Sequence, residues 1–453
     1  MQIGNVQKLI TIFEQSFKRM GVQVSLERVE MLAVTIHRGM TAQARHFHTL
    51  EHVFAFADSN EPISILASLY HDIVYHQVDL GFSPHIWELI SPYILPTDAG
   101  FNISAHISVQ DRLANLTLDV FGLRPGQPLI SMSILNEFLS ALVLNRQLGD
   151  LLGAKEILQM NLCIEATIPF RGRTSDGESY FEVMERRLPE IAKKYEIDLN
   201  EEEIIKTLRI AVTFGNKDIE NFAEADPGRF LDNTWKLLPE SNAALRLPDV
   251  YSIGTYREAL QKMALFFENL DSQSVFNQYR GVPSDLEYQQ MLRYARINIE
   301  VAREYLKLKI LSMTVLETLA IATGGDAPVS LFMGDVPREG VSIKRLEYFL
   351  PEVEDSAWID YSSMIYKLLE SGRSTDTSFD MKNSPLSLFL YKSIAPQKLE
   401  QDMQRAQLFF AGKISADDFL MGMDRPVVRA IANASAMMVF TRREGLRKYA
   451  NLA

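Results

Sequence analysis

Apolar residues recur at helical spacing along nearly the whole chain of 453 residues. In VQKLITIFEQSFKRM, one stripe with i, i+3, i+4 spacing contains Val6, Leu9, Ile10, Phe13 and Phe17. Comparable spacing runs through ISILASLYHDIVYH, EEEIIKTLRIAVTFGNKD and EYQQMLRYARINIEVAREYLKLKILSMTVLETLAIAT. No run of alternating β-branched residues and no Asn-Gly turn interrupts these stretches. We therefore expect an all-α fold without strands.

Composition and charge narrow the class of protein. A hydrophobic fraction of 47% with 23% charged residues is typical of a globular protein. The net charge of −12 argues against a binding surface for duplex nucleic acid. One cysteine, Cys163, cannot form an internal disulfide, which fits the cytoplasm. No signal-peptide pattern and no run of about 18 apolar residues occurs, so we expect no membrane association.

The length predicts about two or three domains, at roughly 150 residues each. We place one boundary after the hydrophobic stretch Trp235–Pro239, which gives domains 1–245 and 246–453. The second domain is helical and rich in Met, Phe and Tyr, and it carries no motif that we can tie to chemistry. A partner interface, a dimerisation surface that makes a homo-oligomer, and a sensor all remain open as its role.

Histidines are concentrated near the start of the chain, and none follows His106. His48 and His52 are four residues apart, which on a helix places both imidazoles on one face. His71 and Asp72 are adjacent within an apolar stretch that we expect to be helical. A buried aspartate is costly unless a cation compensates it, and a divalent metal ion is such a cation. The alternative is that His52 and His71 are ordinary core histidines and that Asp72 caps a helix.

Two segments, RHFHTLEHV (45–53) and YHDIVY (70–75), resemble the HD superfamily of metal-dependent phosphohydrolases, and one bacterial branch in particular. That branch typically continues with N-E-x-x-S-A, then I-x-x-T, then a late Asp. The corresponding segments here are NEFLSA (136–141), IEAT (164–167) and NKD (216–218). The resemblance covers roughly residues 25 to 225 and implies a helical HD domain followed by a second helical domain.

The resemblance also implies roles for individual residues. His52, His71, Asp72 and Asp218 match the metal ligands, and Asp226 and Asp232 are alternatives to Asp218. His48 matches the general acid that protonates a leaving oxygen, and Glu137 and Glu165 match positions that orient a bridging water or a second ion. Residues 77–135 separate the HD pair from NEFLSA, which departs from the family pattern. We expect this segment to be an insertion, with a lid over the site as one role for it.

A divalent ion would activate water for attack on phosphorus, and Asp72 would act in catalysis if it bridges two ions. Manganese, magnesium, iron, nickel and zinc all suit a His/carboxylate set, and one or two ions are expected. Guanidinium groups favour phosphate oxygens, so we nominate Arg45, Arg171 and Arg173 as substrate-binding residues, with Thr167 of the IEAT segment. For each arginine, an ordinary solvated charge is the alternative.

Three functions follow as hypotheses. The first is a metal-dependent hydrolase of a phosphomonoester or phosphodiester, with a nucleotide or another small phosphorylated molecule as substrate. The second is a catalytically silent metal-binding scaffold whose C-terminal domain carries an interaction. The third is an HD-type di-iron oxygenase, which needs two further histidine ligands. The histidines available for that purpose are His76, His85 and His106.

Overall fold

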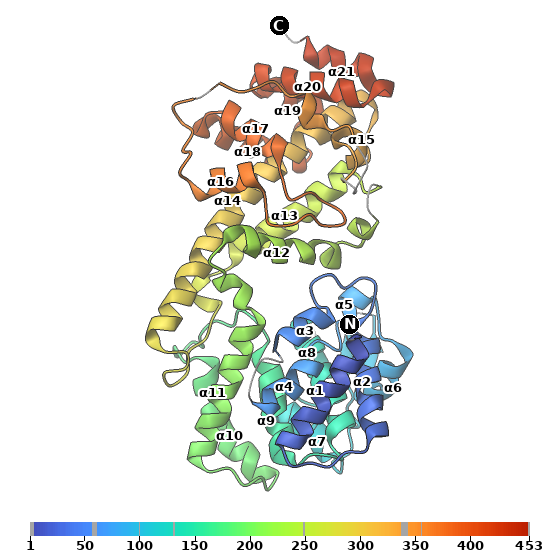
Figure 1. Ribbon diagram of the computed structural model, residues 1–453, viewed down its shortest axis with the longest axis vertical. Helices are drawn as coiled ribbons and strands as arrows, with labels where there is room; N and C mark the ends of the chain where they lie inside the picture. Colours follow the sequence, from blue (N-terminus) through green and yellow to red (C-terminus); the bar gives the residue numbers. More distant parts are fainter. Residues whose placement is uncertain are drawn as a thin grey trace. The chain divides into compact units, whose positions relative to one another are not determined.

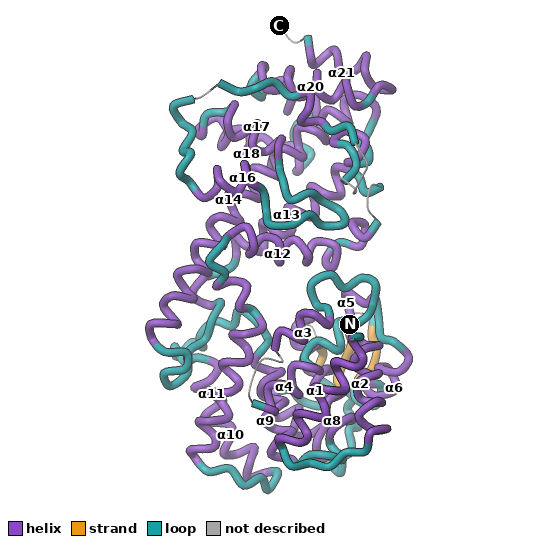
Figure 2. The backbone as a smooth tube through the Cα atoms, in the orientation of Figure 1, coloured by secondary structure: helices purple, strands orange, loops and turns teal. Residues whose placement is uncertain are grey.

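The computed structural model describes residues 4–56, 61–98, 100–129, 132–247, 250–336, 343–354 and 356–451. Helices dominate these residues, which confirms the all-α prediction (Figure 2). None of the described helices is long and apolar enough to cross a membrane.

The chain forms two compact units, and each is described by itself. The first unit comprises Met1–Ala223 and Asp271–Arg293, and the second comprises Glu224–Leu270 and Tyr294–Ala453. These bounds differ from a single division at residue 245. The chain leaves the first unit and later returns to it, and a local apolar pattern carries no signal for such a return.

Eleven described helices belong to the first unit before residue 223 (Figure 1). Their bounds are α1 Asn5–Arg19, α2 Leu26–Met40, α3 Leu50–Phe56, α4 Pro62–Tyr70, α5 His76–Asp79, α6 Pro84–Ile90, α7 Arg112–Phe121, α8 Met132–Leu148, α9 Ala154–Ala166, α10 Tyr180–Lys194 and α11 Glu201–Asp218. A short 3-10 helix, Glu220–Ala223, follows α11.

Helix α9 lies at the centre of this unit, where it packs against α4, α7, α8 and α11. Most of its residues from Ile157 to Glu165 are buried, and of these only Asn161 and Glu165 are polar. Helix α11 begins at a capping box in which Asn200 and Glu203 bond each other's backbone N–H groups. Its core-facing residues pack on α9, so its last residue, Asp218, has a defined position.

A small antiparallel sheet lies in the first unit, in the order β1-β2-β3, with bounds β1 Ile94–Thr97, β2 Gly100–Ile103 and β3 Pro128–Leu129. Ile94 pairs with Ile103, and Phe101 pairs with Leu129. The expectation of no strands is therefore wrong for this segment. The strands are only two to four residues long, too short to show an alternating pattern. They fall inside the predicted insertion, residues 77–135.

The remaining helices build the second unit, except that α14 begins in the first. Their bounds are α12 Pro227–Ser241, α13 Ile253–Asn269, α14 Asp285–Gly324, α15 Val329–Met333, α16 Met364–Ser371, α17 Pro385–Ser393, α18 Pro396–Phe410, α19 Ala416–Gly422, α20 Arg425–Met438 and α21 Arg443–Ala450. Short 3-10 helices span Ala243–Arg246, Ser272–Ser274, Leu346–Phe349 and Phe440–Arg442, and the second of these lies in the first unit.

A buried ionic group lies in the core of the second unit. Lys309 Nζ donates to Asp380 Oδ2 at 2.7 Å, and Arg373 Nη2 lies 3.4 Å from the same oxygen. The indole N–H of Trp235 also donates to Asp380 Oδ2, at 2.8 Å. Burial alone would raise the pKa of Asp380, but the charges of Lys309 and Arg373 outweigh it and lower that pKa.

Candidate metal centre

Four side chains from separate parts of the first unit converge on one point. His52 Nε2 lies 3.1 Å from Asp218 Oδ1 and 3.6 Å from Asp72 Oδ2. His71 Nε2 lies 3.0 Å from Asp72 Oδ2 and 3.3 Å from Asp218 Oδ1. One ligand atom from each of the four lies within 4.8 Å of the others, so together they could hold a metal ion. We call this group the candidate metal centre.

The histidines reach this point differently from the expectation. Helix α3 begins at Leu50, so His48 lies in the bend before the helix and His52 lies within it. Helix α4 ends at Tyr70, so His71 and Asp72 lie in the turn that follows. The predictions that His48 shares a helix with His52, and that a helix contains His71 and Asp72, are therefore wrong. At the segment after Tyr70, side chains distant in sequence bond the backbone groups that a longer helix would use.

Arg45 holds the turn that contains Asp72. Its guanidinium donates to both carboxylate oxygens of Asp79, at 2.9 and 2.7 Å. It also donates to the backbone carbonyls of Asp72 and Ile73, at 2.7 and 3.4 Å, and to Met40 Sδ at 3.0 Å. An arginine side chain has five N–H donors, and these contacts use all five. Arg45 is buried, so its guanidinium orders the turn and has no N–H left for a substrate phosphate.

Helix α8 holds the other side of the same turn. Ser140 Oγ accepts the backbone N–H of Val74 at 3.1 Å, and Asn136 Oδ1 accepts that of His76 at 3.1 Å. Both belong to the NEFLSA segment, and their partners are ones that the sequence does not reveal. The backbone N–H groups that follow His71 and Asp72 are thus bound by side chains, so they do not form the hydrogen bonds that would extend α4.

Glu137, on the same helix, is close enough to the centre to feel its charges. Burial raises the pKa of Glu137 well above its usual value, and the nearby carboxylates of Asp72 and Asp218 raise it further. Its Oε2 atom is buried and has no hydrogen-bond partner among the described residues. A buried carboxyl oxygen of this kind is suited to accept a proton from water or to contact a second cation.

The hydrogen bond behind His71 defines which ring nitrogen faces the centre. His71 Nδ1 lies 2.8 Å from the carbonyl oxygen of Ser68, an atom that can only accept a hydrogen bond. Nδ1 therefore carries a proton, and Nε2 faces the candidate metal centre. Burial lowers the pKa of His71, but the carboxylates of Asp72 and Asp218 outweigh burial and raise it, so Nε2 would release a proton on binding a cation. Histidine ligands of metals are commonly oriented in this way.

The carboxylates and imidazoles of the centre stabilise each other's charged forms. Burial raises the pKa of Asp72, but His71 and the other nearby imidazoles outweigh burial and lower it. Burial also raises the pKa of Asp218, and hydrogen bonds from His52 and His71 outweigh it. Asp72 Oδ2 is buried and makes no contact of hydrogen-bond geometry with the described residues. Two partly buried carboxylates with two imidazole nitrogens fit a divalent ion.

His48 lies beside the centre and outside the four-residue group. Its ring centroid is 6.1 Å from that of His52 and 4.3 Å from that of Tyr75. The charge of His48 also contributes to lowering the pKa of Asp72. His48 is thus near enough to act on a substrate held at the centre.

The other nominated residues form a separate cluster at the end of α9. Arg171 Nη1 donates to Glu165 Oε1 at 2.6 Å, and Thr167 Oγ1 donates to the carbonyl of Ile164 at 2.7 Å. Arg173 Nη1 donates to the carbonyl of Gly177 at 2.8 Å. Burial raises the pKa of Glu165, and Arg171 opposes this shift. The resemblance implies that Glu165 orients a bridging water or a second ion. In the structure, its carboxylate pairs with Arg171.

The alternative ligands lie elsewhere. Asp226 caps α12 by accepting the N–H of Gly228 at 2.9 Å. Asp232 accepts a hydrogen bond from Thr375 at 3.2 Å within the second unit. The spare histidines also have other surroundings. His76 stacks near Phe82 and Phe101, His85 Nε2 lies 3.2 Å from Thr35 Oγ1, and His106 is exposed.

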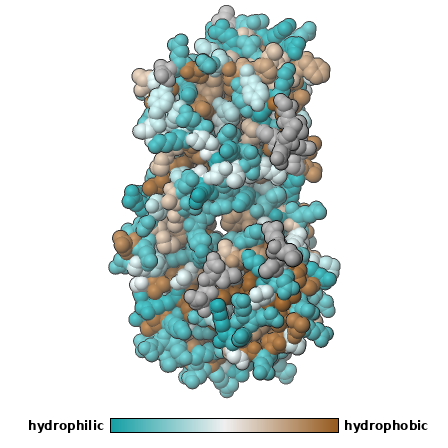
Figure 3. All heavy atoms as spheres, viewed as in Figure 1, coloured by the Kyte–Doolittle hydropathy of each residue, from teal (hydrophilic) through white to brown (hydrophobic). Residues whose placement is uncertain are grey.

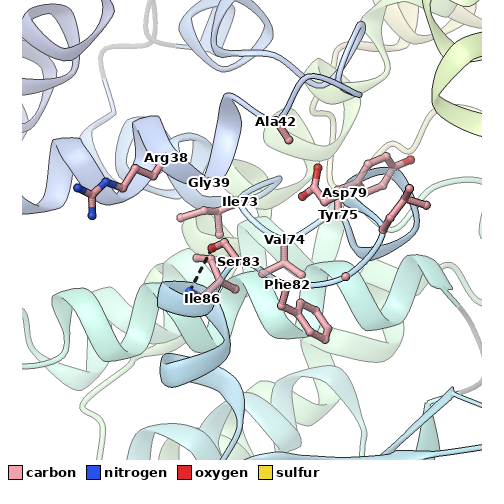
Figure 4. A pocket seen from close by; sticks show the side chains of 12 residues that line it. Arg38, Gly39, Ala42, Ile73, Val74, Tyr75, Asp79, Phe82, Ser83 and Ile86 are labelled. Atoms are coloured by element: carbon pink, nitrogen blue, oxygen red, sulfur yellow. Dashed lines mark hydrogen bonds between the residues drawn. The ribbon is translucent and has the colours of Figure 1, made fainter. Parts of the chain in front are cut away.

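A pocket of about 240 Å³ adjoins the turn that follows Asp72. Ile73, Val74 and Tyr75 form one wall, with Asp79 and Phe82 nearby (Figure 4). The carboxylate of Asp79 is already bound by Arg45. Because the pocket is open, fewer side chains pack against the turn on that side. Hydrogen bonds from Arg45 and to α8 therefore hold the turn.

Comparisons of the chain with protein-family models, with curated proteins and with solved structures find no match.

Proposed function

We propose that this protein is a metal-dependent phosphohydrolase of the HD type that acts on a small phosphate ester. The observation that carries this proposal is the convergence of His52, His71, Asp72 and Asp218 on one point. Three of these residues lie in the two segments that resemble the HD superfamily, and the fourth is the late aspartate.

His52, His71, Asp72 and Asp218 would hold a divalent ion, which would supply a water of lowered pKa as the nucleophile at neutral pH. A cation at the centre would offset the carboxylates of Asp72 and Asp218, which add to burial in raising the pKa of Glu137. The Oε2 atom of Glu137, buried near the centre, would then accept a proton from that water. His48 donates a proton to the departing oxygen of the ester. Arg45 positions the turn that contains Asp72 and does not bind the substrate.

The placement of the histidines favours hydrolysis over di-iron oxygenase chemistry. An oxygenase of the HD type needs two further imidazole ligands. His76, His85 and His106 are outside the four-residue group, and aromatic rings, Thr35 and solvent surround them instead.

The experiment is metal analysis of the purified protein combined with a hydrolysis screen. Phosphomonoesters and phosphodiesters are tested with manganese, magnesium, iron, nickel and zinc, and Asp72→Ala is the inactive control. We expect a bound divalent ion and hydrolysis of at least one class of ester, with both lost in Asp72→Ala. Bound metal without hydrolysis supports the scaffold alternative, and a wild-type protein that binds no metal excludes both functions.

A further inference from the structure

A second pocket in the first unit, of about 340 Å³, is lined by residues from two distant stretches of the chain. The loop between α9 and α10 contributes Arg171, Arg173 and Tyr180, and the returning segment contributes Phe276, Asn277 and Tyr288. None of the four residues of the candidate metal centre lines this pocket. Its volume falls in the range of about 300–1,000 Å³ typical of small-molecule sites, unlike the 240 Å³ pocket beside Asp72.

We propose that this pocket binds a small organic oxyanion that carries a flat ring, at a site separate from the candidate metal centre. The inference does not depend on the proposed hydrolysis. It rests on the donors and rings that line the pocket and on the way the structure holds them.

Arg171 is held rigidly at the pocket. Its Nε donates to the carbonyl of Ile168 at 3.1 Å, and its two Nη atoms bond the side chain and the carbonyl of Glu165. Each Nη carries two N–H groups, so one on each remains after these bonds. The guanidinium also lies 4.0 Å from the centre of the Tyr180 ring. A donor that is fixed in advance loses little conformational entropy when a ligand binds.

Arg173 supplies positive charge that internal partners neutralise only weakly. Nη1 bonds the carbonyl of Gly177, and the nearest carboxylate contact, to Glu182, is 3.7 Å long. Nε and Nη2 of Arg173 have no hydrogen-bond partner within the part of the chain that the structure describes. Among the described residues that line the pocket, Asp271 alone is acidic, and it accepts the N–H of Gln273. An oxyanion is therefore the complementary ligand.

Aromatic side chains make the rest of the wall suitable for a flat ring. Tyr180, Phe276 and Tyr288 all line the pocket, next to the side-chain amide of Asn277. The rings provide apolar contact area, and the amide can form directed hydrogen bonds. This mixture is typical of a site that orients a small molecule.

The pocket is joined to the helix that carries Asp218. Asn216 Nδ2 donates to the carbonyl of Asn277 at 2.7 Å, and the N–H of Asn277 donates to Asn216 Oδ1 at 2.9 Å. Asn216 is buried and lies two residues before Asp218 on α11. A ligand in the pocket would therefore stabilise the segment that clamps this end of α11.

Calorimetric titration of the full chain with phenyl phosphate, benzoate and phenol tests the inference. Metal is removed on a chelating resin, because a soluble polyanionic chelator would compete for the site. Phenyl phosphate and benzoate distinguish a phosphate from a carboxylate ligand, and phenol lacks the oxyanion. We expect at least one of the two anions to bind more tightly than phenol. Arg173→Gln should weaken that binding about tenfold or more, because a charged hydrogen bond is lost.

Arg19→Gln is the matched control, since Arg19 is an exposed arginine of the same unit that does not line the pocket. It should bind the anion like the wild-type protein. The inference is overturned if phenol binds as tightly as both anions, if no probe binds, or if Arg173→Gln and Arg19→Gln behave alike. Because the protein is free of metal, none of these results depends on hydrolysis.

Discussion

His52 Nε2 lies 3.1 Å from Asp218 Oδ1, although 166 residues separate the two positions in the sequence. The contact forms because α11, whose last residue is Asp218, packs on α9, and α9 also packs on α4. The turn after α4 supplies His71 and Asp72, so one central helix brings together candidate ligands that are far apart in the sequence.

Replacement of Arg45 by lysine should weaken metal binding without removing a ligand. Lysine has three donors in place of five, so it cannot replace all five hydrogen bonds that Arg45 makes. We expect a loss of about 10–100-fold in metal affinity, the range seen when partners of metal ligands are removed. Metal titration measures this, with the exposed Arg38→Lys as the control. Equal affinities in the two variants would show that Arg45 does not position Asp72.

His48→Ala should retain metal and lose turnover selectively. Hydrolysis of an alkyl ester, whose leaving oxygen needs a proton, should fall by about 10²–10⁴-fold. An activated aryl ester, whose leaving group departs unprotonated, should be affected much less. Metal analysis and turnover on both esters provide the check. Loss of metal in this variant, or an equal decrease on both esters, would assign His48 another role.

Glu137→Gln should lower turnover without lowering stability. The neutral amide cannot accept a proton from water, yet it removes a carboxyl group that burial and two neighbouring carboxylates disfavour as a charge. We expect a melting temperature in the metal-free protein at least equal to that of the wild type. Differential scanning calorimetry and turnover measure the two effects. A large decrease in melting temperature together with normal turnover would assign Glu137 to the core instead.

The fold class could be predicted from the sequence because apolar periodicity is a local property. Val6, Leu9 and Phe13 form a stripe whether or not the rest of the chain is known. Helix ends in the site could not be predicted in this way. Helix α4 stops at Tyr70 because Arg45 and Ser140 take backbone groups of the next residues, and both partners are distant in sequence.

The site could be predicted only as far as motif spacing carries information. The segments RHFHTLEHV and YHDIVY indicate His52, His71 and Asp72. Asp226 and Asp232 are alternatives to Asp218, and only the fold shows which aspartate lies near the histidines. The preference of arginine for phosphate predicts that Arg45 binds substrate. In the structure, Arg45 binds the carboxylate of Asp79, a residue that no motif marks. Ser68, whose carbonyl orients His71, contributes only a backbone atom, so the residue type carries no signal.

Asp380→Asn should destabilise the second unit. Removal of this buried carboxylate leaves Lys309 and Arg373 poorly compensated, which costs about 3–5 kcal/mol for a broken buried ion pair. The pKa of Asp380 in the fold lies below its ordinary value of 3.8. Its stabilising contribution is therefore complete above that value and is lost as the pH falls through the lower, folded value.

Chemical denaturation, followed by tryptophan fluorescence because Trp235 bonds Asp380, measures this loss. Asp335→Asn, at an exposed aspartate of the same unit, is the control. Equal unfolding midpoints for the two variants at neutral pH would contradict the assignment of Asp380 as the centre of the ionic group.

Anomalous X-ray diffraction from crystals grown with Mn²⁺ tests the central claim most directly. We expect a peak bounded by His52 Nε2, His71 Nε2 and carboxylate oxygens of Asp72 and Asp218, and its loss in Asp218→Ala. A well-ordered crystal with no peak there, or a peak that Asp218→Ala leaves unchanged, would contradict the metal centre and the hydrolysis proposed from it.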